Sequence, residues 1–185
     1  LRIGCIQCLL ELTVSSGLID VKILDANTLA AGFASVDLAV RLHVFDHLPS
    51  TQAYLKDHAD TFYPSNIATA YQAELCICDW QTDGSGRRGR EWSSQAGNIT
   101  MSLLTHSQRS PMELMGLSLV SGISISETIN ELTGFKVEAK WPNDIIINDG
   151  KLGGILVDVL PQQRQGWMNV VTGVGINYRE ESAEL

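Results

Sequence analysis

Basic residues are scarce in this sequence. Its 185 residues include 13 Lys and Arg against 21 Asp and Glu, which gives a formal net charge of −8 at pH 7. Because non-specific binding to nucleic acid draws on a positive surface, we expect no DNA-binding role for this chain. Five of the thirteen basic residues lie in three short motif-like stretches: Arg87, Arg88, Arg90, Lys140 and Lys151.

Cysteines are also few, at positions 5, 8, 76 and 78. The first two have the spacing of half a zinc site, but no second pair with ligand spacing accompanies them, so we predict no metal site built from protein side chains. Cys76 and Cys78 alternate within an apolar run, so both thiols are expected on one face of a buried strand. Buried, reduced thiols suit a cytoplasmic protein.

No apolar run reaches the roughly 18 residues that a membrane-spanning helix needs. Residues 1–12 are apolar but lack a basic leading region and a small-residue cleavage site, so we expect neither a signal peptide nor membrane association. Internal repeats and low-complexity segments are absent as well. With 44% apolar and 18% charged residues, the composition is that of an ordinary globular domain.

The hydrophobic pattern predicts short strands around one long helix. A second, shorter helix is expected from Gln52, with Ser50 or Thr51 as its N-cap, and Asp149-Gly150 predicts a hairpin turn. We expect the long helix over 112–133, ended by Gly134, and strands at 42–48, 67–71, 74–80, 97–104, 135–141, 145–148, 151–160 and 168–174. This order favours an α+β fold with a mixed or largely antiparallel sheet.

Residues 81–92, Gln-Thr-Asp-Gly-Ser-Gly-Arg-Arg-Gly-Arg-Glu-Trp, place three glycines and three arginines directly after an apolar strand. Glycines let a backbone approach a ligand closely, and arginine guanidinium groups match phosphate and carboxylate oxygens. The loop is therefore interpreted as an anion-binding site, although a solvated surface hairpin has the same composition. A dinucleotide-binding turn is excluded because no helical pattern follows the glycines.

Three further stretches combine polar residues with close-packing glycines. Ser50-Thr51 lies at a predicted helix N-terminus, which suits either capping or ligand contact. Lys140-Trp-Pro-Asn-Asp144 is followed by Lys151-Leu-Gly-Gly154, and Gly173-Val-Gly-Ile-Asn177 ends the last strand. Glycines inside a strand weaken it, so Gly153-Gly154 indicates close approach of a ligand or another backbone.

In this order, the four stretches resemble the catalytic domain of biotin protein ligases, across roughly residues 43–177. The resemblance implies the class II aminoacyl-tRNA synthetase-like fold of biotin and lipoate ligases. It assigns residues 43–185 to the catalytic domain, cut before a C-terminal SH3-like domain. Residues 1–42 are then an N-terminal remnant or linker, too short for a complete winged helix.

The resemblance also implies an activity. Enzymes of this kind bind biotin, ATP and Mg²⁺, form biotinyl-5′-adenylate, and transfer biotin to one lysine of a carrier domain. The implied partner is the biotin carboxyl carrier protein of acetyl-CoA carboxylase or of a related carboxylase. Relatives often dimerise, so a homodimer is compatible with the resemblance.

By resemblance, Lys140 would be the main catalytic residue, contacting the biotin carboxylate and the α-phosphate, and Arg87 would order the loop over the adenylate. Trp92 and Trp141 would be structural. The implied biotin-binding residues are Ser50, Thr51, Gln81, Gly84, Gly86, Arg87, Lys140, Gly153, Gly154 and Gly173. The implied nucleotide-binding residues are Arg87, Arg88, Arg90, Asn143, Lys151 and Asn177.

Two positions depart from the family pattern. Gln52 stands where the family has Asn, and Ser85 replaces a basic residue of the loop, which removes one cation from the phosphate-binding set. Two alternatives to biotin ligation stay open. One is a lipoyl- or octanoyl-transferring enzyme on the same scaffold, and the other is a protein that binds biotin or its adenylate without turnover.

Overall fold

The computed structural model describes residues 39–62, 72–95, 97–161 and 166–178. The features predicted before residue 39, including the Cys5–Cys8 pair, and the strand predicted at 67–71 lie outside these ranges. Among the described residues, no helix is both long enough and apolar enough to cross a bilayer.

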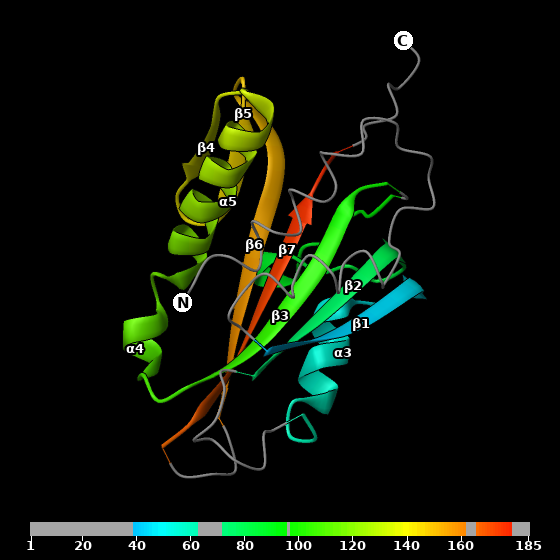
Figure 1. Cartoon of the computed structure of the whole chain (residues 1–185), viewed down its shortest axis with the longest axis vertical. Helices are drawn as coiled ribbons and strands as arrows, with labels where there is room; N and C mark the ends of the chain where they lie inside the picture. Colours follow the sequence, from blue (N-terminus) through cyan, green and yellow to red (C-terminus); the bar gives the residue numbers. More distant parts are fainter. Residues whose placement is uncertain (1–38, 63–71, 96, 162–165, 179–185) are drawn as a thin grey trace.

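A seven-stranded sheet with the order β1-β2-β3-β7-β6-β5-β4 forms the frame (Figure 1). Among the described strands, β1 and β2 pair in parallel and the other pairings are antiparallel, which confirms the predicted mixed, largely antiparallel sheet. The strands are β1 Ala39–Leu48, β2 Gln72–Gln81, β3 Ile99–Ser107, β4 Val137–Lys140, β5 Asp144–Ile147, β6 Gly150–Pro161 and β7 Met168–Ile176.

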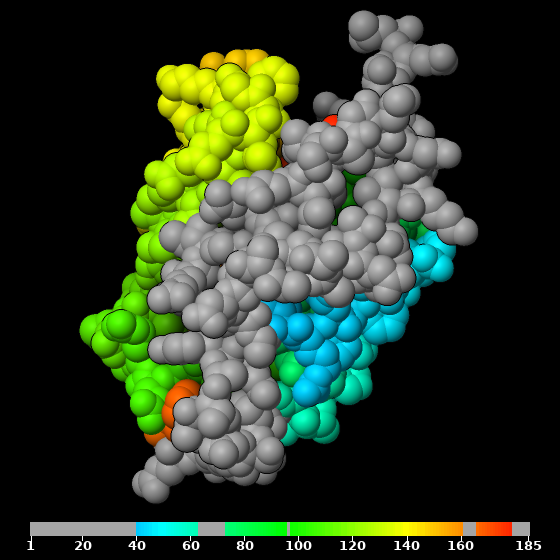
Figure 2. Space-filling view, in the orientation of Figure 1, coloured from blue at the N-terminus to red at the C-terminus, as the bar shows by residue number. Residues whose placement is uncertain are grey.

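Two helices cover opposite faces of the sheet. Helix α3 (Thr51–His58) packs on one face, where Leu55 meets Cys76, Leu104 and Val171. Helix α5 (Leu117–Thr133) packs on the other face, over β4, β5 and β6. Its Ile125 and Ile129 join the larger core, to which β2, β3 and β7 also contribute side chains. The alternation of side chains along each strand is what separates the two cores. In the space-filling view, α5 and β1 lie on opposite flanks of the molecule (Figure 2).

The single helix predicted over 112–133 is wrong, because two helices occupy this stretch. Helix α4 (Pro111–Leu114) begins at a capping box between Ser110 and Glu113, with proline in its first turn. It ends at Met115, and α5 starts after Gly116. The predicted end at Gly134 is confirmed, since its φ of 73° is left-handed and suits glycine.

The hairpin between β5 and β6 forms as expected but one residue earlier along the chain. Its two central residues are Asn148 and Asp149, both with positive φ (47° and 64°), which is the geometry of a tight two-residue hairpin. Beyond it, Gly153 packs against the backbone of β7, where a Cβ would lie 2.6 Å from the carbonyl oxygen of Gly175. Close backbone approach therefore explains this glycine.

Cys76 gives a testable consequence of the buried strand. Burial raises the pKa of its thiol from 9.0 to about 12, so the folded protein keeps this proton above pH 9 while the unfolded chain loses it. The unfolded state then binds fewer protons, and the free energy of unfolding falls as pH rises from 9 towards 12. Urea titrations at pH 8 and pH 10.5 measure this slope.

Cys76→Ala is the matched control, because it removes the Cys76 thiol and leaves in place the lysines and tyrosines, which also titrate at high pH. We expect a shallower loss of stability in this variant over the same pH interval. Equal slopes in the two proteins would contradict the assignment to Cys76.

Candidate functional site

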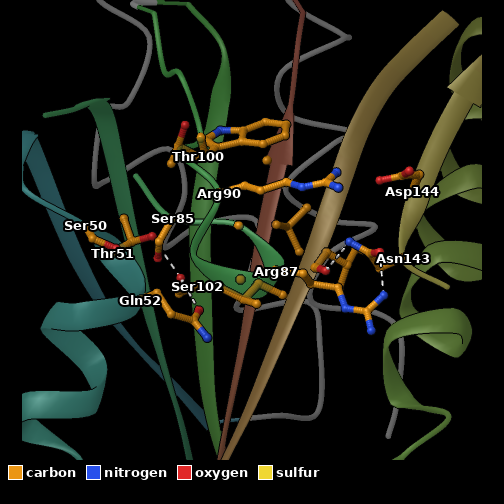
Figure 3. Close-up of a pocket in the computed structure, with 18 of the residues that line it drawn as sticks. Ser50, Thr51, Gln52, Ser85, Arg87, Arg90, Thr100, Ser102, Asn143 and Asp144 are labelled. Atoms are coloured by element: carbon orange, nitrogen blue, oxygen red, sulfur yellow. Dashed lines mark hydrogen bonds between the residues drawn. The ribbon is translucent and has the colours of Figure 1, made fainter. Parts of the chain in front are cut away.

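A cavity of about 380 Å³ lies on the α3 side of the sheet. The N-terminus of α3, residues 81–92, strands β3, β6 and β7, and the turn between β4 and β5 surround it (Figure 3). Eleven of the predicted site residues line it: Ser50, Thr51, Gln81, Gly86, Arg87, Arg88, Arg90, Asn143, Lys151, Gly154 and Gly173. Stretches far apart in sequence thus converge on one volume.

Four predicted site residues do not line this cavity: Gly84, Lys140, Gly153 and Asn177. Gly84 instead shapes the loop, since its carbonyl accepts from the Trp92 amide at 2.8 Å and a side chain there would collide with the Trp92 carbonyl. The backbone N–H of Asn177 donates to the Leu152 carbonyl oxygen. Lys140 is exposed at the end of β4, opposite Asp144.

A buried hydrogen-bond network closes the inner end of the cavity. The Gln81 side-chain oxygen accepts from the Thr51 amide at 2.7 Å and lies 3.0 Å from the Thr51 hydroxyl. That hydroxyl is 2.8 Å from the Ser102 hydroxyl, which is 3.0 Å from the side-chain oxygen of Gln52. All four side chains are at most 7% exposed.

The two hydroxyl hydrogens are enough for the acceptors of this network. The Gln81 atom is an oxygen because a backbone N–H donates to it, and the Gln52 atom is an oxygen because its partner nitrogen donates to the Val171 carbonyl. Since the Gln81 oxygen already accepts from the Thr51 N–H, the Thr51 hydroxyl can donate to Ser102 and the Ser102 hydroxyl to Gln52. The two hydroxyl oxygens keep lone pairs, so the inner end is rich in acceptors and suits an N–H donor from a ligand.

The arginine loop is held to the opposite wall of the cavity through Asn143. The Arg87 guanidinium donates to the Asn143 side-chain oxygen at 3.1 Å (Figure 3), and Asn143 is itself fixed by two bonds to the Ile155 backbone. Arg88 has a positive φ of 60°, which is uncommon for a residue with a side chain and is found at functional sites. The loop is therefore ordered while its guanidinium groups remain exposed.

Lys151 and Trp92 form the wall opposite α3. The Lys151 ammonium lies 2.8 Å from an Asp144 carboxylate oxygen and 5.6 Å from the centre of the Trp92 ring. The ring covers Gly175 and Gly154, where a Cβ at Gly175 would overlap the indole. These glycines make room for Trp92, which lines the cavity rather than standing apart as a purely structural residue.

The cavity is cationic although the protein is acidic. Its charged lining residues are four cations, Arg87, Arg88, Arg90 and Lys151, and two carboxylates, Glu91 and Asp144. Four positive and two negative charges leave a local excess of two positive charges, in a chain of net charge −8. A concave site of this sign draws anionic ligands.

The polar lining residues that sequence reasoning did not assign to the site include Thr100, Ser102 and Asp144. The signal for the first two was the alternation along β3, in which polar residues take every second position and face α3. Asp144 was noted only as part of a strand-breaking stretch. Its place beside Lys151 follows from the β5–β6 pairing, which sets the two residues on adjacent strands.

The chain matches the biotin/lipoate A/B protein ligase family over residues 44–177. It is 36% identical to the bifunctional ligase/repressor BirA of Salmonella typhimurium over 158 residues. This matched stretch covers 85% of this chain and 45% of BirA. The chain thus spans less than half the length of this curated relative.

Two solved structures resemble the fold closely. The biotin protein ligase of Aquifex aeolicus, in complex with biotin and ATP, has a TM-score of 0.57 at 30% identity, covering 78% of this chain and 55% of that one. The biotin acetyl-coenzyme A carboxylase synthetase of Helicobacter pylori, with bound biotinylated ATP, has a TM-score of 0.58 at 28% identity, covering 78% and 63%. The mixed sheet is the class II synthetase-like fold of these enzymes, and the chain belongs to the biotin/lipoate A/B protein ligase family.

Proposed function

We propose that this chain is the catalytic core of a biotin protein ligase. In the proposed reaction, a carboxylate oxygen of biotin attacks the α-phosphorus of ATP, which forms biotinyl-5′-adenylate and releases pyrophosphate. The side-chain amine of a carrier-domain lysine then attacks the acyl carbon, so that an amide forms and AMP leaves. The chain's similarity to ligases solved with biotin and ATP supports the choice of substrates.

The acceptor-rich network at the inner end is the observation that carries this proposal. Biotin ends in a cyclic urea, which has N–H donors beside a carbonyl acceptor. A urea N–H would donate to a lone pair of the Thr51 or Ser102 hydroxyl oxygen, and the Gln81 amide nitrogen is a donor suited to the urea carbonyl. A lipoyl group has no N–H at its ring end, so this feature favours biotin over the lipoyl or octanoyl alternative.

The outer part of the cavity suits the adenylation step. Bringing a carboxylate to a triphosphate places like charges together, so the cations must offset the repulsion. Lys151 lines the cavity, with its ammonium paired to Asp144 and half of its side chain exposed, whereas Lys140 is not part of the lining. We therefore propose Lys151 as the cation nearest the reacting atoms, with Arg87 and Arg90 over the phosphates, and we keep Lys140 as a competing candidate.

Mg²⁺ enters this proposal with ATP. No group of three or more His, Cys, Asp or Glu side chains gathers among the described residues, so the phosphates themselves would provide most of the ligands. Asp144 is the lining carboxylate that pairs with Lys151, at 2.8 Å. Bound there, the ion would offset part of the phosphate charge.

The acceptor in this proposal is the carrier domain of a biotin-dependent carboxylase, and the place of action is the cytoplasm. The names of the relatives support the first point. Buried thiols at Cys76 and Cys78 support the second. A homodimer stays a prediction for solution measurements.

Adenylate formation tests the proposal directly. We expect biotin-dependent exchange of labelled pyrophosphate into ATP, falling by at least about 100-fold in Lys151→Ala, since a charge-assisted contact contributes about 1.5–3 kcal/mol in the ground state and more in a desolvated transition state. Lys136→Ala is the control, because Lys136 is 86% exposed and pairs with Glu138.

Lys140→Ala is assayed beside these variants. If pyrophosphate exchange falls in Lys140→Ala and stays normal in Lys151→Ala, the assignment of the two lysines is reversed. Biotin binding without any exchange in the unaltered chain would instead favour the binding-only alternative.

The inner network generates a second expectation. Thr51→Val keeps the side-chain volume and removes the hydroxyl from the network, so biotin affinity should fall by about 10- to 100-fold, as expected when a buried polar partner is lost. Titration calorimetry measures this change.

The matched control for that titration is Thr61→Val, because Thr61 is exposed, does not line the cavity, and donates its hydroxyl to the His58 carbonyl. Unchanged affinity in Thr51→Val would exclude this network as the ureido site.

A further inference from the structure

We infer that Gln52 sets the ligand selectivity of the inner end of the cavity. It would exclude ligands that carry a substituent on the ureido nitrogen that reaches this end. This inference rests on the proposed biotin-binding function. It concerns a position where the chain has glutamine instead of the asparagine of the resembling family, so it describes a property of this chain.

The Gln52 side chain is buried and held in one orientation. It is 4% exposed, in the first turn of α3. Its amide nitrogen donates to the Val171 carbonyl at 3.1 Å and to an Asp158 carboxylate oxygen at 3.3 Å. With the nitrogen directed at two acceptors, the amide oxygen faces Ser102 and accepts from its hydroxyl at 3.0 Å (Figure 3).

The same oxygen fills the space above Gly173. A Cβ built on Gly173 would lie 2.5 Å from it and 3.4 Å from the Ser102 hydroxyl oxygen. Gln52 therefore ends the cavity on β7, and the absence of a side chain at Gly173 is what admits it. An asparagine is one methylene shorter and would leave part of this space open to the ligand.

Gln52 also fixes the polarity of the inner end. By taking the Ser102 hydrogen, it leaves the hydroxyl oxygen of Ser102 as an acceptor facing Thr51 and the cavity. A ligand group that reaches this point must bring its own hydrogen and must fit below the Gln52 amide. A free ureido N–H meets both requirements, whereas an N-methylated urea meets neither.

An ion pair lies behind Gln52, outside the cavity. The Asp158 oxygen that accepts from Gln52 is also 2.9 Å from the Lys56 ammonium, one turn further along α3. Lys56 is 39% exposed and does not line the cavity. Removing Lys56 changes α3 but leaves both acceptors of the Gln52 amide, the Val171 carbonyl and Asp158, in the protein, which makes Lys56→Ala a control for general loosening of α3.

The test compares two ligands by titration calorimetry on the whole chain: biotin, and biotin methylated on a ureido nitrogen. We expect the unaltered protein to prefer biotin by at least about 100-fold. In Gln52→Ala, biotin affinity should fall by about 10-fold and affinity for the methylated ligand should rise, so that the preference shrinks to about 10-fold or less. Gln52→Asn should lie between the two, and Lys56→Ala should keep the original preference.

The outcomes separate the inference about Gln52 from the proposed biotin-binding function. If the unaltered protein binds biotin and both Gln52 variants keep its preference, the inference is overturned while the proposed function stands. If the unaltered protein binds no biotin, both fail together. Thermal melting accompanies each titration, and if Gln52→Ala is unfolded, the more conservative Gln52→Asn decides the result.

Discussion

The hydrogen bond from the Thr51 amide to the Gln81 side chain joins the two segments on which the cavity depends. One is the N-terminus of α3 and the other is the end of β2, where the arginine loop begins. The bond is buried, so breaking it would leave a backbone donor and a side-chain acceptor unsatisfied, at a cost of about 1–3 kcal/mol. It sets the distance between the helix and the loop, and so fixes where the ligand's inner end and the cationic mouth lie relative to each other.

Glycines along β6 and β7 provide the space for this arrangement, though each serves a different neighbour. Gly153 admits the backbone of β7, Gly173 admits the Gln52 amide, and Gly175 admits the Trp92 ring. The resemblance implied that two of them, Gly153 and Gly173, bind biotin. Here they first accommodate protein groups, which in turn form the wall and the inner end of the cavity. A side chain at any of them would displace a lining residue before it met a ligand.

The cavity differs from the rest of the molecule in the sign of its charge. An acidic protein with a cationic cavity concentrates its attraction for anions at one place. Asn143 and Asp144 keep Arg87 and Lys151 directed at that place through short side-chain contacts. Because Asn143 ends the turn after β4 and Asp144 begins β5, this corner of the sheet orients cations that belong to two other parts of the chain.

The sequence alone determined the character of the site: an arginine-rich loop after a buried strand, a capped helix beginning at Ser50, and glycines within strands, because each is a local pattern with a local physical cause. It also determined the mixed sheet through the two-residue alternation of its strands. Tertiary structure alone decided that Lys151 rather than Lys140 lines the cavity, and that Ser102 meets Gln52. These features depend on pairing across strands and on contacts between residues about 50 or more positions apart, and no local pattern in the sequence carries that information.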